Sequence, residues 1–254
     1  MLKKRIVPIM LLSNGRLVKG RQFSAYRDVG DPVKSAAVYN SQLADELVII
    51  NINQGQGIEP LLAIVDKLSR VCFMPLTLGG GIRSLDDGAA LIMRGADKIL
   101  VNSLCYRDLG VITALSQRFG KQAVICAVDA RWHAEQQCYR LYSECGSMAE
   151  TISLEQHIEA LIKAGAGEIL IQSIDHDGSM QGYDLNLIHQ VQQHAGSTPL
   201  LAAGGSGNYD HLKELFLTSQ VDAAVCGSLF NFSDSNPLRA KAYLLNYNIP
   251  LKKV

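Results

Sequence analysis

The sequence predicts an α/β protein that folds as a single (β/α)8 or TIM barrel, and three observations lead to this fold class. Short apolar segments alternate eight times with amphipathic segments over 254 residues. The apolar segments lack a polar face, which is typical of parallel strands that are buried on both sides. The second half of the chain also repeats motifs of the first. Eight such units in this length favour a closed barrel over a doubly wound open sheet, which normally has fewer units.

The eight apolar segments have the length of strands. They cover residues 6–12, 46–52, 73–78, 98–102, 122–129, 168–175, 199–203 and 222–228. Helical patterns lie between them, among others at 32–44, 153–166 and 208–219. Ser153 and Asn208 stand directly before two of these patterns, where a side-chain oxygen can cap a helix.

An internal repeat supports the closed barrel. The segment "PLTLGGGIRSLDD" at 75–87 aligns with "PLLAAGGSGNYDH" at 199–211, and "ADKILVNS" at 96–103 aligns with "VDAAVCGS" at 221–228. Likewise "ADELVII" aligns with "AGEILIQ" further on. Two half-barrels, at about 1–120 and 121–254, explain this repeat. No change of composition separates them, so residues 1–254 are predicted to form one domain.

The composition excludes several classes of function. Lys plus Arg and Asp plus Glu both number 24, and aromatic residues make up 6%, so neither nucleic acid nor an anionic membrane is expected as a partner. The apolar segments are far shorter than the roughly 18 residues of a membrane span. Histidines and cysteines show no ligand spacing, so we predict no metal and no cofactor. Six scattered cysteines indicate a reduced, cytoplasmic protein.

Glycine-rich segments follow one strand in each half, and the next strand in each half ends in a short polar motif. The segments are "GGGIRS" at 79–84 and "AGGSGN" at 203–208; the motifs are "VNS" at 101–103 and "CGS" at 226–228. Glycine lets the backbone approach an anion, and a helix N-terminus supplies N–H donors. The alternative is that the glycines only turn the chain. We predict two phosphate sites, and therefore a small ligand with a phosphate at each end. The predicted contacts are Gly80, Gly81, Asn102, Ser103, Gly204, Gly205, Gly227 and Ser228.

Three acids stand at strand ends between these sites. A carboxylate there can act as a general acid or base if it reaches the ligand. We predict a catalytic role for Asp129, which directly ends an apolar strand, and we interpret Asp175 as a residue that braces a loop. For Asp177, catalysis and a structural role in a turn both remain open. His176 is interpreted as a solvated loop residue.

The segment "RWHAEQQCYRLYSECG", residues 131–146, predicts a polar hairpin inserted after the fifth strand. Because it follows the C-terminal end of that strand, it is placed to cover the barrel mouth. The only tryptophan, Trp132, belongs to this hairpin.

At the opposite end of the barrel, four strands begin with charged residues: Arg5, Glu46, Lys98 and Glu168. Two acids and two bases at this rim predict a closed ring of ion pairs under the barrel. Ordinary stabilisation of the bottom face and a gate on a central passage are both compatible with such a ring.

Taken together, these motifs resemble the cyclase subunit of imidazole glycerol phosphate synthase. The resemblance runs from residue 1 to about 250 and rests on "KRIVP", "NGRLVKG", "GDPV", "PLTLGGGIRS", "GADKILVNS", "VDA", "SIDHDGSMQGYDL" and "GGSGNYDHL". It implies that a glutaminase subunit docks on the bottom of the barrel and that ammonia crosses the barrel. At the mouth, ammonia would attack a bisphosphorylated ribulosyl-aminoimidazole carboxamide.

The resemblance also assigns roles to individual residues. It favours the gate for the ring of charged residues, and it places Asp97 and Gln122 at the contact with the glutaminase. Lys19, on the loop after the first strand, would help to hold the substrate. Catalysis in the family relies on two aspartates, which end the first and the fifth strand. Asp129 matches the second of these, but Leu11 stands where the first should be.

The internal repeat indicates the same missing aspartate, because "RIVPIMLL" aligns with "AVICAVDA" and Leu11 then stands opposite Asp129. Leucine cannot transfer protons, so we expect impaired cyclase chemistry. Asn51, Gln172 and Ala203 also depart from the family pattern. A second-copy branch of the family, with leucine at this strand end, is associated with surface-polysaccharide gene clusters. This chain is similar to that branch, and the similarity implies that the barrel supplies ammonia to a sugar amidotransferase. A working cyclase of histidine biosynthesis and a non-catalytic binding barrel are the alternatives.

Overall fold

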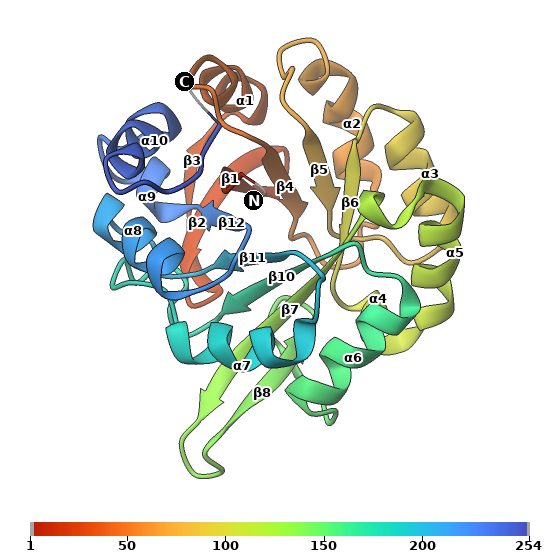
Figure 1. Ribbon diagram of the computed structural model, residues 1–254. Coiled ribbons are helices and arrows are strands. Elements are labelled where there is room, and N and C mark those ends of the chain that lie inside the picture. The colour runs from red at the N-terminus through yellow and green to blue at the C-terminus, as the bar shows by residue number, and fades with distance from the viewer. Residues whose placement is uncertain (1–2, 253–254) are drawn as a thin grey trace.

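The computed structural model describes residues 3–252 and confirms a closed barrel of eight parallel strands (Figure 1). Each strand pairs with the next, and β12 pairs with β1 to close the ring. Every predicted apolar segment overlaps one barrel strand. The barrel strands are β1 (Arg5–Ser13), β4 (Leu47–Asn51), β5 (Leu76–Gly79), β6 (Lys98–Val101), β7 (Val124–His133), β10 (Glu168–Ser173), β11 (Leu200–Ala203) and β12 (Ala223–Cys226).

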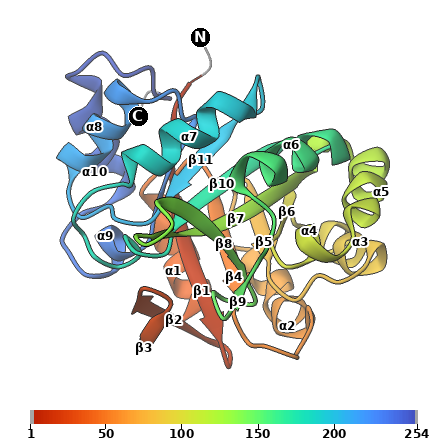
Figure 2. The same cartoon turned by 90° about the horizontal axis from the view of Figure 1, so that it is seen from below.

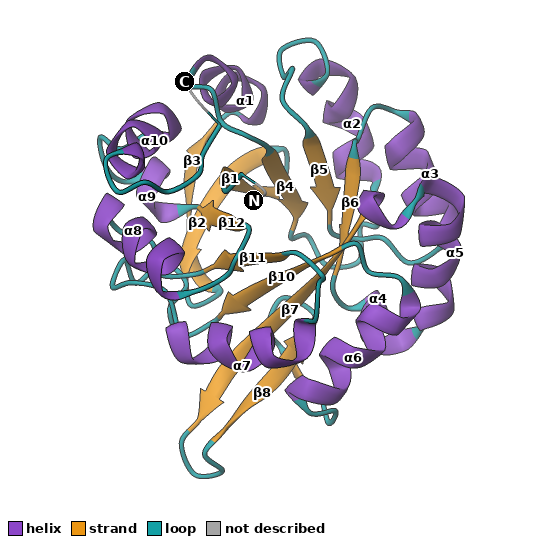
Figure 3. Ribbon diagram, viewed as in Figure 1, coloured by secondary structure: helices purple, strands orange, loops and turns teal. Residues whose placement is uncertain are grey.

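Helices surround the barrel, as the colouring by secondary structure shows (Figure 3). The side chains of Ser153 and Asn208 accept hydrogen bonds from the backbone N–H groups of Gln156 and His211, so both predicted caps are confirmed. The helices are α1 (Pro32–Ser41), α2 (Glu59–Leu68), α3 (Leu85–Met93), α4 (Leu104–Arg107), α5 (Leu109–Phe119), α6 (Leu154–Ala164), α7 (Leu185–Ala195), α8 (Tyr209–Thr218), α9 (Ser228–Asn231) and α10 (Pro237–Leu245), with a 3₁₀ turn at Lys121–Ala123.

Four further strands extend the sheet beyond the barrel. The predicted hairpin after the fifth barrel strand is formed by β7 and β8 (Cys138–Ser143), and β9 (Met148–Ala149) pairs with β8. The segment after β1, expected to be a loop, instead forms a hairpin of β2 (Arg16–Arg21) and β3 (Ser24–Gly30). Its turn residues Gln22 and Phe23 both have positive φ without being glycine, so the usual sequence signal of a tight turn is absent. Figure 2 shows β2 and β3 at the lower end of the barrel, away from the N-terminus.

The core has two layers, and the strand β1 shows how alternation divides residues between them. Ile6, Met10 and Leu12 pack into the large cluster between strands and helices, whereas Val7 and Ile9 belong to the smaller cluster inside the barrel. Successive side chains of a strand point to opposite faces. Position 11 therefore points inward, at the end of the strand that borders the mouth.

The pairing register shows the internal repeat in three dimensions. Leu11 lies opposite Ile50 on the next barrel strand, and Asp129 lies opposite Gln172 on the barrel strand that follows its own. Each also pairs with the antiparallel strand that comes next in the chain, β2 or β8. Leu11 and Asp129 are thus equivalent positions of the two half-barrels, as the sequence alignment predicted.

A buried ion pair ties the last helix to the bottom of the barrel. Lys241 of α10 lies 2.6 Å from Asp45, and the two side chains are 3% and 5% exposed. The Lys241 ammonium also donates to the carbonyl of Leu43 at 2.5 Å. The second carboxylate oxygen of Asp45 accepts from the N–H of Ile6 at 2.8 Å, so the pair joins α10 to the start of β1.

We expect Lys241→Met to lower the free energy of unfolding by about 3–5 kcal/mol, because it leaves the Asp45 carboxylate buried without its partner. Denaturant unfolding measures this change. Lys213→Met, which breaks the exposed pair with Asp210, is the matched control and should cost much less. Equal losses in the two variants would contradict the role of burial. Adding Asp45→Asn to Lys241→Met should restore part of the loss.

Candidate functional site

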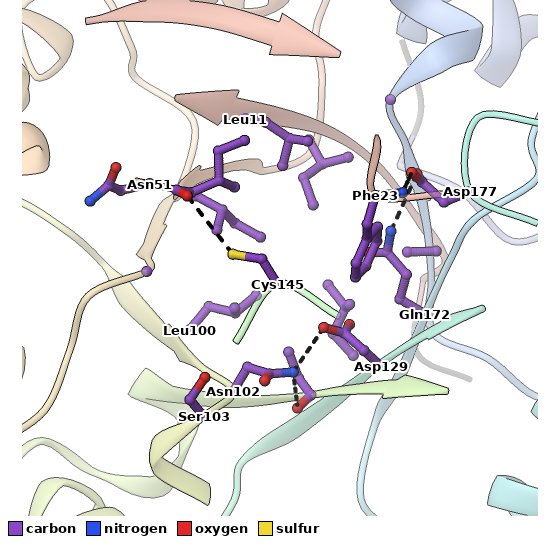
Figure 4. Close-up of a pocket in the computed structure, with 18 of the residues that line it drawn as sticks. Leu11, Phe23, Asn51, Leu100, Asn102, Ser103, Asp129, Cys145, Gln172 and Asp177 are labelled. Atoms are coloured by element: carbon purple, nitrogen blue, oxygen red, sulfur yellow. Dashed lines mark hydrogen bonds between the residues drawn. The ribbon is translucent and has the colours of Figure 1, made fainter. Parts of the chain in front are cut away.

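A cavity of about 400 Å³ lies at the C-terminal ends of the barrel strands. This mouth is lined by strand ends and by the loops that follow them, and Figure 4 shows part of it. Its volume is in the range of small-molecule sites. The hairpins contribute Phe23, Tyr26, Glu144 and Cys145, none of which was singled out from the sequence. Glu144 and Cys145 belong to the segment 131–146, which was predicted to cover the mouth, and this placement is confirmed. The positions of Phe23 and Tyr26 gave no signal, because only the folded β2–β3 hairpin brings them over the barrel.

Asp129 lies in the mouth at the end of the inward-facing row of β7. One of its carboxylate oxygens accepts a hydrogen bond from the side-chain amide of Asn102 at 3.0 Å (Figure 4). Burial, followed by the negative charge of Asp177, raises the pKa of Asp129 to about 7. An acid with such a pKa can exchange a proton near neutral pH, which suits general acid–base chemistry.

Both carboxylate oxygens of Asp177, by contrast, already bond to neighbouring groups. It forms a buried ion pair with Lys19 at 2.6 Å, and the Gln172 amide donates to the same oxygen at 3.3 Å. Its other oxygen accepts from the N–H of Phe23 at 3.4 Å. These contacts join the β2–β3 hairpin to the loop after β10. They favour a structural role for Asp177 and place Lys19 inside the mouth.

The two residues before Asp177 brace the same loop. Asp175 accepts from the N–H of Trp132 at 2.8 Å and lies 3.5 Å from the Arg131 guanidinium, as expected for a bracing residue. His176 is a loop residue, as expected, and it is partly buried, because its ring nitrogen Nδ1 lies 2.7 Å from the carbonyl oxygen of Gly182.

The glycine-rich segments are closely packed against backbone. Gly81 has φ 80°, and a Cβ there would lie 2.0 Å from the carbonyl oxygen of Gly57. Gly205 has φ 106°, and a Cβ there would lie 1.9 Å from the carbonyl oxygen of Gly182. Only glycine fits either position without strain. The same crowding occurs at Gly80 and Gly204. These glycines therefore turn the chain, and the mouth that they border is the predicted place of the phosphates.

Ser103 and Ser228 lie at the starts of the short helices α4 and α9. The Ser103 hydroxyl accepts from the N–H of Glu144 at 3.1 Å. The Ser228 hydroxyl is buried and has no hydrogen-bond partner among the described residues. Gly227 lies next to the Lys19 side chain, since a Cβ at Gly227 would be 3.1 Å from Cε of Lys19. The second predicted phosphate site thus contains an unpaired hydroxyl close to a buried cation.

The two sides of the mouth differ in polarity. Leu11 lines the mouth together with Ile50, Leu100 and Cys145. Figure 4 shows Asp129, Gln172 and Asp177 on the other side. Leu11 is therefore part of an apolar patch of the wall, next to which polar residues such as Asn102 and Ser103 also line the cavity.

Asn51 does not offer a free polar group to this cavity. Its side-chain amide donates to the carbonyl of Gly57 at 3.0 Å, and its oxygen accepts from the backbone and side chain of Asn53 at 3.1 and 2.8 Å. Asn51 therefore organises the loop after β4.

At the opposite end, the predicted ring of charged residues is present. Arg5 lies 2.5 Å from Glu46 and 2.9 Å from Glu168, and Lys98 lies 3.0 Å and 3.1 Å from the same two acids. The four side chains are between 7% and 18% exposed. They close the bottom of the barrel interior with alternating charges.

Asp97 and Gln122 lie at this same end, and both are exposed. Asp97 precedes β6, and one of its oxygens accepts from the N–H of Leu76 at 2.8 Å. Gln122 precedes β7 and donates to the carbonyl of Phe119 at 3.4 Å. Each residue thus has a local contact and a solvent-accessible side that a partner can reach.

Other features of the described chain bear on the class of protein. Among residues 3–252, no cluster of three or more His, Cys, Asp or Glu side chains is arranged to hold a metal ion. No helix in this range has the length and apolar character needed to cross a membrane. The six cysteines, all of which lie in the same range, form no disulfide.

Comparisons with known proteins identify the family. A family model described as "Histidine biosynthesis protein" matches residues 5–236. The chain belongs to this family. Within the histidine biosynthesis family, it is 38% identical over 253 residues to the imidazole glycerol phosphate synthase subunit HisF of Staphylococcus carnosus, with 99% of both chains covered. It is 41% identical over 234 residues to HisF of Leuconostoc mesenteroides, with 92% of each chain covered. HisF of Bacillus cereus strain G9842 is 37% identical and aligns over 99% of this chain. The resemblance to HisF is therefore confirmed at the level of the family.

The raised pKa of Asp129 predicts how stability depends on pH. The folded protein keeps a proton that the unfolded chain releases near the ordinary pKa of 3.8. The free energy of unfolding of the wild type should therefore fall as pH rises from about 4 to about 7. The free energy of unfolding of Asp129→Asn should fall less over this range. Denaturant unfolding at several pH values measures both slopes. Asp86→Asn, an exposed site, is the control and should follow the wild type. Parallel slopes for wild type and Asp129→Asn would contradict the prediction.

Proposed function

We propose that this chain, acting as one domain, is a HisF-like synthase subunit that receives ammonia from a glutaminase and conducts it through the barrel to the mouth. The observation that carries this proposal is the ring formed by Arg5, Glu46, Lys98 and Glu168 across the bottom of the barrel. The glutaminase, a HisH-like subunit, docks on this face and contacts Asp97 and Gln122.

The physical character of the ring supports a gate. Withdrawing charges from water costs several kcal/mol per ion, so a buried ion-pair network is weak evidence for stability alone. Arg5 and Lys98 each contact both Glu46 and Glu168, so either base can release one acid while keeping the other. Exchange of partners then opens the centre of the ring without leaving any charge wholly unpaired.

The interior above the ring supports conduction of neutral ammonia. Side chains that fill it include Val7, Val48, Ile125, Leu170 and Leu201, all apolar. An ammonium ion entering this region would lose its hydration without gaining a partner, whereas neutral ammonia loses much less. The apolar interior thus selects the form of ammonia that reacts as a nucleophile.

At the mouth, we infer two phosphate sites and a weakened cyclase reaction. Gly80, Gly81, Asn102 and Ser103 contribute to one site, and Gly204, Gly205, Gly227 and Ser228 to the other. The unpartnered hydroxyl of Ser228 supports the second site. Asp129 remains as a proton-transfer group whose pKa is raised by burial and then by the charge of Asp177. Asp177 also holds Lys19 toward the ligand. Leu11 leaves Asp129 without a partner acid.

A chain with this mouth fits delivery of ammonia to another enzyme better than efficient ring closure. We propose that the acceptor is a sugar amidotransferase of surface-polysaccharide biosynthesis, which docks over the mouth in the cytoplasm. Conduction of ammonia requires the ring and the apolar interior, but it does not require two acids. This is why the loss of an acid at Leu11 favours the role of a supplier.

An active cyclase of histidine biosynthesis is the second candidate. Two observations favour it: the pKa of Asp129, about 7, suits proton transfer at neutral pH, and the relatives named above are imidazole glycerol phosphate synthase subunits. The two candidates differ in how much cyclase activity the unmodified chain retains.

We predict that Leu11→Asp raises the cyclase rate by about 10²–10⁴-fold, because it restores a carboxylate at the position equivalent to Asp129. The assay uses the bisphosphorylated ribulosyl-aminoimidazole carboxamide with free ammonium salt, so that no glutaminase is needed. Leu11→Asn, which has the same shape without an ionisable proton, is the control and should stay slow. A wild-type rate that already equals that of an ordinary HisF cyclase would favour the second candidate and overturn the supplier role.

The docking face gives a separate prediction. Asp97→Asn keeps an oxygen that can accept from Leu76 but removes the charge, so binding of a HisH-like glutaminase should weaken by about tenfold. Isothermal titration calorimetry measures the affinity. Asp86→Asn, which follows the C-terminal end of β5 on the mouth side, is the matched control and should bind unchanged. Equal affinity of wild type and Asp97→Asn would remove Asp97 from the interface.

A further inference from the structure

A second cavity of about 420 Å³ lies outside the barrel, beside α4, α6 and the segment that follows β9. The helices α4 and α6 are neighbours around the barrel (Figure 1). Its lining combines apolar side chains, the rings of Tyr106 and His157, and polar or charged side chains. The apolar ones are Leu109, Ile152 and Ala160, and the polar or charged ones are Arg107, Asp108, Glu150 and Thr151. Nothing in the proposed ammonia conduction uses these residues.

Tyr106 and His157, which line this cavity, each have a buried polar atom without a hydrogen-bond partner among the described residues. Their rings are stacked, with centroids 4.1 Å apart and an angle of 7° between the planes. His157 is only 1% exposed, and neither its Nε2 atom nor the Tyr106 hydroxyl has a hydrogen-bond partner among the described residues. Buried polar atoms nearly always have partners, because leaving them unpaired is costly. Two such atoms on parallel rings indicate a place for a ligand.

The electrostatics of the cavity argue against an anionic ligand. Burial lowers the pKa of His157 to about 4, so its ring is neutral at physiological pH, and burial raises the pKa of Tyr106 far above its ordinary value. The cation of Arg107 at the rim is already paired with Glu150 at 3.1 Å. An anionic ligand would therefore lose its hydration without meeting an unpaired cation, and the carboxylate of Asp108, which also lines the cavity, would repel it.

We propose that this cavity binds a small uncharged molecule through a primary amide group. The amide oxygen accepts from the Tyr106 hydroxyl, and an amide N–H donates to Nε2 of His157. A primary amide offers an acceptor and a donor on adjacent atoms without a charge, which matches two unpartnered atoms on two parallel rings. The apolar part of the molecule lies against Leu109, Ile152 and Ala160.

The cavity is connected to the mouth of the barrel. Arg107 lines both cavities, and both it and Glu150 bond to the Ser143 hydroxyl. The next residue, Glu144, donates its N–H to the hydroxyl of Ser103. The backbone amide of Glu144 is therefore a natural reporter of ligand binding in the second cavity.

Benzamide, an amide on a rigid apolar ring, provides the test on the full-length protein. We expect saturable shifts of the His157 ring and Glu144 amide signals in an NMR titration. Tyr106→Phe keeps the stacked ring but removes the hydroxyl, so it should weaken binding by about tenfold. Tyr26→Phe removes a hydroxyl from the mouth and should leave benzamide binding unchanged. Benzoate, which has the same shape and a charge, should bind at least about tenfold more weakly than benzamide.

Three results would overturn the proposal: no saturable binding of benzamide, equal affinity of wild type and Tyr106→Phe, or benzoate binding as tightly as benzamide. A crystal of the wild type soaked in benzamide gives an independent measurement, which needs no variant. An amide within hydrogen-bond distance of both Tyr106 and His157 is the expected result. Water alone at these two atoms, or an adventitious additive only, would overturn the proposal.

Discussion

The closed ladder of parallel strands is the constraint on which the rest of the structure depends. Because β12 pairs with β1 and every strand runs in the same direction, all strand ends of one kind meet at one end of the barrel. Residues more than a hundred positions apart in the chain, such as Lys19 and Asp177, thereby become direct neighbours. The same closure forces alternate residues inward, which creates both the apolar interior and the side chains that face the mouth.

The two half-barrels share a frame but divide the charged groups between them. Glu46 and Glu168 are equivalent residues of the two halves, and both take part in the ring at the bottom. The cations of the ring come from the first half alone, since the alignment places Ala123 and Ala223 opposite Arg5 and Lys98. At the mouth the division is reversed, because the acid lies in the second half and leucine in the first. A repeated frame thus carries an asymmetric set of polar groups, one at each end of the barrel.

Asp129 illustrates how a site can keep part of its chemistry after losing a partner. Its raised pKa arises from burial and from the negative charge of Asp177, which lies in the same half of the barrel. The hairpins after β1 and β7 close over the same cavity and supply Phe23 and Cys145 to its wall. The mouth therefore remains a shaped, ligand-sized cavity, although the first strand no longer offers a carboxylate.

The sequence by itself determined the barrel, the positions of its eight strands, the ring of charged residues and the equivalence of Leu11 with Asp129. These follow from local patterns, namely apolar runs, repeated motifs and charges at strand ends, which the chain carries whatever its tertiary contacts. Only the tertiary structure decided the rest. The β2–β3 hairpin turns at Gln22 and Phe23 without glycine, so its turn has no local signal. The pairing of Lys19 with Asp177 and the stacking of Tyr106 on His157 join segments distant in sequence, and a single sequence shows no pattern for contacts that exist only after the barrel closes.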